Sequence, residues 1–363
     1  MDNVTTAFVK KIFVSYYGNA DFSIPSIEMR EFGIGNQKKI DARHLNFNSA
    51  AEFRSYLCTN TPLFVSHSTA YYEFPGASPM QKKGWKGADL VFDLDIHAEG
   101  KYGAYAKLDE VKGDVIRLVD DFVLSDFGIK KEHVAIVFSG NRGYHVHVRD
   151  PAFITLGGEE RRELVDYVMG QGLDYLKFLT LEGKPAKLLG PRPDEGGYRG
   201  RFARAAIKMV REEPMALSKK FKDEKECDFF ISGINEGNWS KTPLKLADLR
   251  SRLSVVAKDL SVRSVNTDAG VTQDLSKLIR VPNSIHGDTG LVARIVGDIE
   301  AFDPWKDASL KGEALKVRFI EDVPELDLDE TTGPFKKDEE RELPRHQALL
   351  FLCKGSAVLA TSS

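Results

Sequence analysis

The chain of 363 residues is long enough to bury a sizeable core and, at roughly 100 to 200 residues per domain, predicts about two units. Its formal net charge of -3 excludes a globally basic nucleic-acid binder, so any such partner must be held by a local basic patch or by metal ions. The three cysteines form no C-x-x-C pair, and no stretch approaches about 18 apolar residues. We therefore expect an intracellular, cytoplasmic protein without disulfides, a thiolate zinc site or a membrane segment.

Hydrophobic periodicity predicts a mixture of strands and helices. In chain order, the expected elements are an amphipathic segment at 8–16, strands at 27–34, 63–67 and 88–95, a helix at 108–122, strands at 134–138 and 144–148, and a helix at about 159–176. The section from about 177 to 259 is richer in charge and poorer in strand signals, which favours a mostly helical insertion. Strands and turns return at 268–296.

These elements predict a mixed α/β (α+β) fold with a discontinuous core and an inserted subdomain. The core is expected at 1–165 and 260–330, and the mostly helical subdomain at 166–259. The remaining residues, 331–363, form a C-terminal tail whose apolar run 349–352 is either a helix or a partner contact.

Two aspartates, one residue apart, end the strand-like run Val91-Phe92-Asp93-Leu94-Asp95. Because side chains of a strand alternate between its faces, Asp93 and Asp95 are expected to point the same way. Two like charges on a buried strand repel each other unless a cation or a proton lies between them, and a divalent metal ion is one explanation. The solvated end of an ordinary strand is the other, since D-x-D patterns are common.

The segment Ser139-Gly140-Asn141-Arg142-Gly143 joins two predicted strands, and its glycines suit a tight hairpin with positive φ. Its backbone N–H groups, the Ser139 hydroxyl and the planar guanidinium of Arg142 suit phosphate oxygens. His145 and His147 share a face of the following strand. The histidines could contact phosphate, bind zinc or lie hydrogen-bonded in the core; without a third nitrogen or sulfur ligand nearby, phosphate contact is favoured.

A third constellation contains Asp268 and Asp274, then Arg280 at a strand end, and then His286 in a turn bounded by proline and glycine. A surface loop beside a well-formed strand would have the same sequence. The alternative is a third carboxylate ligand beside two triphosphate contacts. Three carboxylates with separate basic and imidazole groups are what nucleotidyl transfer by two metal ions requires, and oxygen-only ligands favour Mg²⁺ or Mn²⁺ over zinc.

On the segments 83–95, 138–148 and 278–287, the chain resembles the small catalytic subunit of archaeal and eukaryotic DNA primase, with the spacing of the archaeal form. The resemblance spans roughly residues 30 to 300. It implies a primase catalytic core and a DNA-directed nucleotidyltransferase that makes short RNA, and possibly DNA, primers from nucleoside triphosphates on a single-stranded DNA template. It also implies a heterodimer with a large regulatory subunit.

The family's functional residues transfer by motif. The resemblance implies metal ligation by Asp93, Asp95 and Asp268, with Asp274 as the alternative third ligand. It implies contacts to the incoming nucleotide from Arg43, Ser139, Arg142, His145, Arg280 and His286, and it assigns no role to His147. Many relatives carry a zinc-binding knuckle after the aspartate pair, but the stretch 96–109 offers only His97, so we expect no zinc.

A basic surface for DNA is expected in two places, although a solvated helix face has a similar sequence. The residues concerned are Arg192, Arg199, Arg201, Arg204, Lys208 and Arg211, and Lys82, Lys83 and Lys86 near the aspartate strand. Three rival functions remain open: a primase-like polymerase for repair or end joining, a metal-dependent phosphohydrolase, and a non-catalytic subunit.

Overall fold

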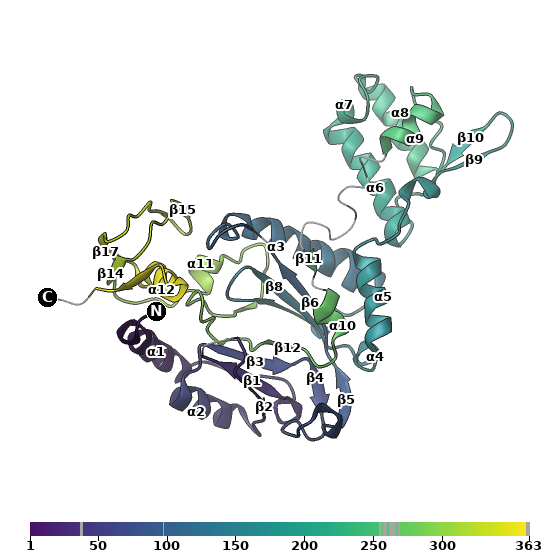
Figure 1. The fold of residues 1–363 in the computed structure, drawn as a ribbon. Helices are drawn as coiled ribbons and strands as arrows, with labels where there is room; N and C mark the ends of the chain where they lie inside the picture. The colour runs from purple at the N-terminus through teal and green to yellow at the C-terminus, as the bar shows by residue number, and fades with distance from the viewer. Residues whose placement is uncertain are drawn as a thin grey trace. The chain divides into compact units, whose positions relative to one another are not determined.

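The computed structural model describes residues 1–36, 39–96, 98–253, 256, 260, 266–267 and 269–360. The chain divides into two compact units, the first made of 1–116, 130–163 and 264–363, and the second of 117–129 and 164–263. Helices combine with several antiparallel sheets, which confirms the predicted α+β class (Figure 1). Within the described ranges, no helix is both long and apolar enough to cross a membrane.

The first unit contains two main antiparallel sheets, in the orders β12-β3-β1-β2 and β11-β6-β8-β7-β13. Its described strands are β1 (Phe32–Gly35), β2 (Ala42–Leu45), β3 (Phe64–Ser68), β4 (Ala70–Tyr72), β5 (Trp85–Ala88), β6 (Leu90–Asp95), β7 (Val134–Phe138), β8 (Gly143–Val148), β11 (Asn266–Thr267), β12 (Leu278–Arg280), β13 (Ile295–Val296), β14 (Leu315–Phe319), β15 (Leu326–Asp327), β16 (Thr331–Thr332), β17 (Glu340–Leu343) and β18 (Ala357–Leu359).

Several helices accompany these sheets, and α3 and α5 contribute residues to both units. They are α1 (Asn3–Tyr17), α2 (Ala50–Asn60), α3 (Leu108–Arg117), α4 (Pro151–Ile154), α5 (Gly158–Val168), α10 (Ala269–Gln273), α11 (Pro304–Asp307) and α12 (Arg345–Lys354), with short 3₁₀ turns at Ile27–Met29, Met80–Lys82, Tyr105–Lys107 and Lys131–His133.

The second unit is mostly helical in its described part and has one small hairpin. Its elements are the π-helical segment Leu118–Asp126, the 3₁₀ turn Tyr175–Phe178, β9 (Thr180–Glu182), β10 (Lys187–Leu189), α6 (Gly197–Glu212), α7 (Pro214–Leu217), α8 (Glu224–Asn235) and α9 (Leu246–Arg252). Its core contains an aromatic cluster in which Phe202 stacks on Trp239 with ring centroids 5.5 Å apart.

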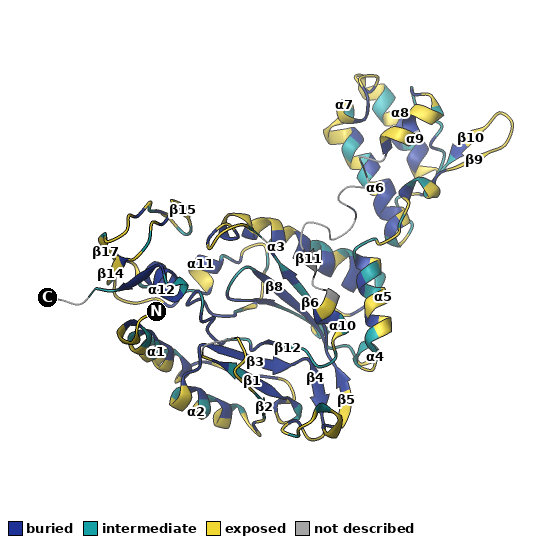
Figure 2. Ribbon diagram, viewed as in Figure 1, coloured by how far each residue is buried: buried dark blue, intermediate teal, exposed yellow. Residues whose placement is uncertain are grey.

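Aromatic side chains fill the space between α1, α2 and β1. Phe53 of α2 contacts both Phe22 and Phe32, with ring centroids 5.1 and 4.9 Å apart. Ser49 caps α2 by accepting a hydrogen bond from the Glu52 N–H group, which fixes where this helix begins. Figure 2 shows the result, with buried strands and helices exposed along their outer sides. This packing anchors the four-stranded sheet.

Two predicted elements differ from what the apolar pattern suggested. The strand expected at 88–95 is two strands, because β5 ends at Ala88 and pairs with β4, whereas β6 begins at Leu90 and joins another sheet. The helix expected to reach 176 stops at Val168, and Gly170 and Gly172 follow with φ of 62° and 69°. In the tail, the run 349–352 is a helical core segment of α12.

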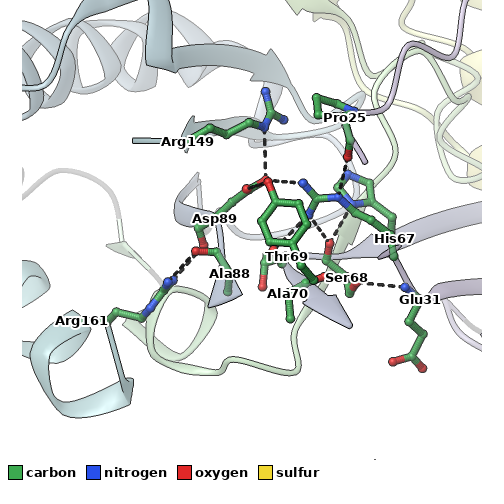
Figure 3. Close-up of polar contacts among 12 residues, drawn as sticks. Pro25, Glu31, His67, Ser68, Thr69, Ala70, Ala88, Asp89, Arg149 and Arg161 are labelled. Atoms are coloured by element: carbon green, nitrogen blue, oxygen red, sulfur yellow. Dashed lines mark hydrogen bonds and ion pairs between the residues drawn. The ribbon is translucent and has the colours of Figure 1, made fainter. Parts of the chain in front are cut away.

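A buried carboxylate, Asp89, lies where β5 ends and β6 begins (Figure 3). Its Oδ2 accepts hydrogen bonds from Arg30 Nη2 at 2.9 Å and Arg149 Nε at 3.2 Å, and its Oδ1 accepts one from the Tyr71 hydroxyl. Arg161 of α5 donates to the carbonyl oxygen of Asp89 at 2.8 Å. The network thereby ties β4, β6, the end of β8 and α5 to the segment before β1.

Replacing Asp89 by asparagine is expected to lower the free energy of unfolding by about 3 to 5 kcal/mol, because it leaves the fully buried Arg30 guanidinium without a counter-charge. Denaturant unfolding of the parent and Asp89→Asn measures this loss.

The matched control for this change is Asp338→Asn, which breaks an exposed ion pair with Arg318 whose side chains are 68% and 44% exposed. We expect a cost of about 0 to 1 kcal/mol there. Equal losses in the two variants would refute the anchoring role of Asp89.

Candidate active site

The aspartate pair lies on one face of β6, as strand alternation predicts. Asp93 and Asp95 are partly exposed, whereas Phe92, before the pair, and Leu94, between the two aspartates, are fully buried. In the ladder with β8, Asp93 pairs with His145 and Asp95 with Gly143. Both carboxylates therefore face the turn that joins β7 to β8.

Each carboxylate has a partner from that hairpin. Arg142 Nη2 donates to Asp95 Oδ2 at 3.0 Å, and His145 Nε2 lies 3.5 Å from Asp93 Oδ1. The side chain of Arg142 is 35% exposed and that of Asp95 26%, so water screens this ion pair and it can exchange for other contacts.

The predicted hairpin is confirmed, since β7 and β8 pair antiparallel up to Phe138 and Tyr144. Ser139 Oγ accepts hydrogen bonds from the N–H groups of Asn141 and Gly143, both at 3.3 Å, which leaves its hydroxyl hydrogen available to a ligand. Gly140 has the expected positive φ of 78°.

Gly143 is required for a different reason from the one the sequence suggested. It does not have a positive φ; instead, a Cβ built at this position would lie 1.9 Å from the Leu94 carbonyl oxygen and 2.6 Å from Asp95 Oδ1. The absence of a side chain allows the hairpin to approach β6 closely, which places Arg142 beside Asp95.

A cavity of about 530 Å³ collects most of the predicted site residues. Its walls come from both main sheets, with β6 and the hairpin on one side and β3 and β12 on the other. The predicted residues that line it are Asp93, Asp95, Ser139, Arg142, His145, Arg280 and His286. They are joined by Lys39, Ile40, Ser66, Asn141, Lys277, Leu278 and Ile279.

Arg280 and the hairpin histidine differ sharply in charge. Burial lowers the pKa of the Arg280 guanidinium to about 10, so it stays charged at neutral pH. Within the described part of the chain its Nη1 has no hydrogen-bond partner, and no carboxylate lies within ion-pair distance. Burial, with Arg280 nearby, lowers the pKa of His145 to about 3. The site thus holds a buried cation beside a neutral imidazole.

His286 is neutral as well, since burial and then the charge of Arg280 lower its pKa. Its Nδ1 accepts a hydrogen bond from the Asp288 N–H group at 3.2 Å, so the ring proton is assigned to Nε2. Thr289 Oγ1 donates to the Gly140 carbonyl oxygen and fastens this turn to the hairpin. His286 is therefore held ready to donate a hydrogen bond.

Two residues named from the sequence, Arg43 and the alternative ligand Asp274, are not among those that line this cavity. Arg43 donates to Glu31 through Nε at 2.8 Å and through Nη2 at 3.2 Å, and its proposed phosphate contact stays a prediction. Asp268 and His97 lie outside the described residues. The alternative ligand Asp274 is exposed, and its Oδ1 accepts hydrogen bonds from the Ser276 N–H and hydroxyl groups.

Two residues of the expected basic DNA surface are buried instead. Lys83 is fully buried, 3.5 Å from Glu31 Oε2, and donates to the Pro75 carbonyl oxygen. Arg201, in the second unit, pairs with Asp126 at 2.8 Å, and its guanidinium packs over aromatic rings. Neither side chain is free for a phosphate backbone, because each neutralises a buried acid.

Sequence reasoning missed Lys39, Ser66 and Lys277 as lining residues. Lys277 directly precedes the segment 278–287, so its neighbourhood was a usable signal. Ser66 lies in a strand that was predicted, but nothing in the local pattern marks its face as part of a site. Lys39 has no local signal at all.

The aspartate pair fits a hard divalent cation. Both carboxylates reach the cavity, and the ion pair of Asp95 with Arg142 shows that this carboxylate is oriented to receive positive charge. Within the described ranges, no group of three or more His, Cys, Asp or Glu side chains could hold a metal ion. Two carboxylates completed by water and phosphate oxygens suit Mg²⁺ or Mn²⁺, which keep several such ligands.

Comparison with known proteins agrees with this geometry. The family model described as DNA primase small subunit matches residues 92–298, which include the aspartate pair, the hairpin and the segment 278–287. The relatives named DNA primase small subunit PriS include those of Methanococcoides burtonii, 33% identical over 98% of this chain and 99% of the relative, and Archaeoglobus fulgidus, 34% identical over 98% of each. That of Methanothrix thermoacetophila is 34% identical over 98% of this chain and 99% of the relative.

These matches identify a DNA-directed nucleotidyltransferase. The chain belongs to the DNA primase small subunit family, as the catalytic subunit, which confirms the resemblance and the enzyme class predicted from the sequence.

Gly143→Ala is expected to push the hairpin away from β6 and to lower the free energy of unfolding by about 1 to 3 kcal/mol. Denaturant unfolding measures this. Gly113→Ala is the matched control, because no atom lies within 4 Å of a Cβ built there, inside α3. That helical substitution should be neutral or slightly stabilising. A Gly143→Ala variant as stable as the control would contradict the close-approach argument.

His147→Leu is expected to flatten the loss of stability in acid. His147 is fully buried, neither ring nitrogen has a hydrogen-bond partner within the described residues, and burial lowers its pKa well below 6.5. As the pH falls below about 6.5, the unfolded imidazole takes up a proton that the folded one refuses, so stability falls by about 1.4 kcal/mol per pH unit. Unfolding free energies measured from pH 7 to pH 5 should fall more steeply in the parent than in His147→Leu, by up to about this slope, because His145 and His286 keep their lowered pKa values in both proteins.

His133→Gln serves as the control for that experiment, because the His133 side chain is 32% exposed. Its stability should follow the parent curve. If the stability of His147→Leu also changes with pH as that of the parent does, His147 does not contribute to the acid sensitivity.

Proposed function

We propose that this chain synthesises short primers on single-stranded DNA from nucleoside triphosphates by two-metal-ion nucleotidyl transfer. The observation that carries the proposal is the cavity with two unlike walls. Asp93 and Asp95 project from one sheet, while the buried Arg280, which has no carboxylate partner among the described residues, projects from the other. A ligand that joins cations to phosphates, as a metal-bound nucleoside triphosphate does, complements both walls.

In this reaction a 3′-hydroxyl oxygen attacks the α-phosphorus, the α–β phosphoanhydride bond breaks, and pyrophosphate leaves. Mg²⁺ or Mn²⁺ held by Asp93 and Asp95 would acidify the hydroxyl and neutralise the leaving group. Arg280 contributes a fixed positive charge for the phosphates, and neutral His145 and His286 contribute hydrogen bonds. Ser139 donates its hydroxyl hydrogen from the hairpin.

Arg142 has two alternative partners in this scheme. Its guanidinium lies on Asp95, and a triphosphate offers it a planar set of oxygens instead. Moving Arg142 from Asp95 to phosphate frees the carboxylate for the metal ion at the moment the nucleotide arrives. Because this ion pair is partly exposed, breaking it costs little free energy.

We propose Asp268 rather than Asp274 as the third carboxylate. Thr267, which precedes Asp268, pairs with Leu94 between the two aspartates of β6. The carboxylate of Asp274, by contrast, is occupied by Ser276 and is not among the residues that line the cavity. We further propose that the chain binds no zinc, because the stretch 96–109 lacks the cysteines of a zinc knuckle, and that it pairs with a large regulatory subunit, which the family membership supports.

Replacing Asp93 or Asp95 by asparagine should reduce templated synthesis at least about 10³-fold, because the metal ions lose a charged ligand worth several kcal/mol in the transition state. Asp268→Asn should do the same. Asp274→Asn is the matched control and should retain activity near that of the parent. Primer synthesis is measured on single-stranded DNA with each metal ion and each nucleotide set, and circular dichroism checks the fold.

Full activity in Asp93→Asn or Asp95→Asn would refute the metal assignment, and loss confined to Asp274→Asn would exchange the third ligand. Starting a chain from two free nucleotides on bare template supports primase activity. Extension of existing ends alone would indicate a repair-type polymerase, and release of phosphate without templated product would indicate a phosphohydrolase.

A further inference from the structure

A second, smaller cavity of about 220 Å³ adjoins the candidate active site. The two cavities share Lys39, Asn141 and Arg142. The smaller one is otherwise lined by Ala98, Gly100, Lys101, Ala104, Asp288 and Lys354. It is therefore built where the tip of the hairpin, the loop after β6, the turn after β12 and the end of α12 meet.

Lys354 is the last residue of α12, and Gly355, at φ of 68°, ends the helix behind it. Burial lowers the pKa of its ammonium group, and the charges of Arg142 and Lys101 lower it further, while Asp288 opposes them. The Nζ atom lies 5.3 Å from the centre of the Tyr105 ring. Among the described residues it has neither a hydrogen-bond acceptor nor a carboxylate within 4 Å, unlike the ammonium of Lys101, which lies 2.5 Å from Glu321 Oε1.

The charges around this cavity do not cancel. Arg142 is paired with Asp95 and Lys101 with Glu321, so both have their own carboxylates. Among the described residues that line the cavity, that leaves Lys39 and Lys354 with a single acid, Asp288. Both lysines are close enough to His286 to lower its pKa, which places them in the field of the candidate active site. The surplus is positive, as an anion site requires.

We propose that this cavity binds the pyrophosphate moiety of the nucleotide, first as the β- and γ-phosphates of the bound triphosphate and then as the released product, with Lys354 as its principal contact. The inference rests on the proposed function and adds a subsite to it. Arg142 borders both cavities, so a triphosphate that draws this guanidinium away from Asp95 extends toward Lys354. A partly desolvated ammonium gains most from a charged acceptor.

The test compares Lys354→Met with the parent, with Lys354→Arg and with Lys316→Met, whose side chain is 63% exposed on β14. Binding of a non-hydrolysable nucleoside triphosphate, of inorganic pyrophosphate and of a nucleoside monophosphate is measured by calorimetry in Mg²⁺. Steady-state primer synthesis gives KM and kcat. Thermal unfolding checks that each variant is folded.

We expect Lys354→Met to weaken triphosphate and pyrophosphate binding about tenfold or more and to raise KM for the nucleotide by a similar factor. Monophosphate binding should stay the same, kcat should change little, and Lys354→Arg should restore most of the affinity. Lys316→Met should match the parent. Weaker triphosphate binding with unchanged pyrophosphate binding would restrict the subsite to the intact nucleotide and overturn the product half of the proposal.

Affinities equal to those of the parent would overturn the whole inference, and lower stability with unchanged affinities would mean that Lys354 only packs on Tyr105 and balances Asp288. These outcomes are distinct from failure of the proposed function, in which the parent itself would neither bind the triphosphate nor synthesise primer.

Discussion

The first unit depends on how the buried charge of Asp89 is neutralised. Two guanidinium groups, those of Arg30 and Arg149, share this one carboxylate, and removing the carboxylate would leave the buried Arg30 charge uncompensated away from water. Leu90 and Val148 are partners in the β6–β8 ladder, so the pair of Asp89 with Arg149 extends that ladder by one position. The register that carries the active-site aspartates is therefore fixed a few residues upstream by a buried ion cluster.

The same principle separates structural cations from functional ones. Arg30 and Arg201 are buried, and each reaches a carboxylate within 3 Å. Arg280 is buried to a similar degree, yet it packs over the Phe64 ring and reaches no carboxylate in the described chain. Keeping a charge out of water without a partner costs free energy. An anionic ligand would offset that cost, which is why Arg280 is a stronger indication of phosphate binding than any surface lysine.

Local sequence patterns predicted β6, the β7–β8 hairpin and half of the residues that line the cavity, because strand alternation and glycine placement act over a few residues. They wrongly placed Lys83 and Arg201 on the surface, because the acids that pair with these cations are distant in sequence and hydrophobic periodicity does not reveal them. The interruption of the predicted strand at Asp89 was also missed, because an apolar run does not reveal that the chain passes from one sheet to another. Lys354 carries no motif and joins the site only through the fold.

The electrostatics of the cavity are built to be insensitive to pH near neutrality. His145 and His286 lie among cations and out of water, so their imidazoles stay neutral where an exposed histidine would titrate. Arg280 and Arg142 bring positive charge to the cavity, and guanidinium groups keep their protons at neutral pH. The neutral imidazoles can therefore offer hydrogen bonds, while the arginines supply charge. With exposed histidines in place of these arginines, the charge of the cavity would change with pH near neutrality.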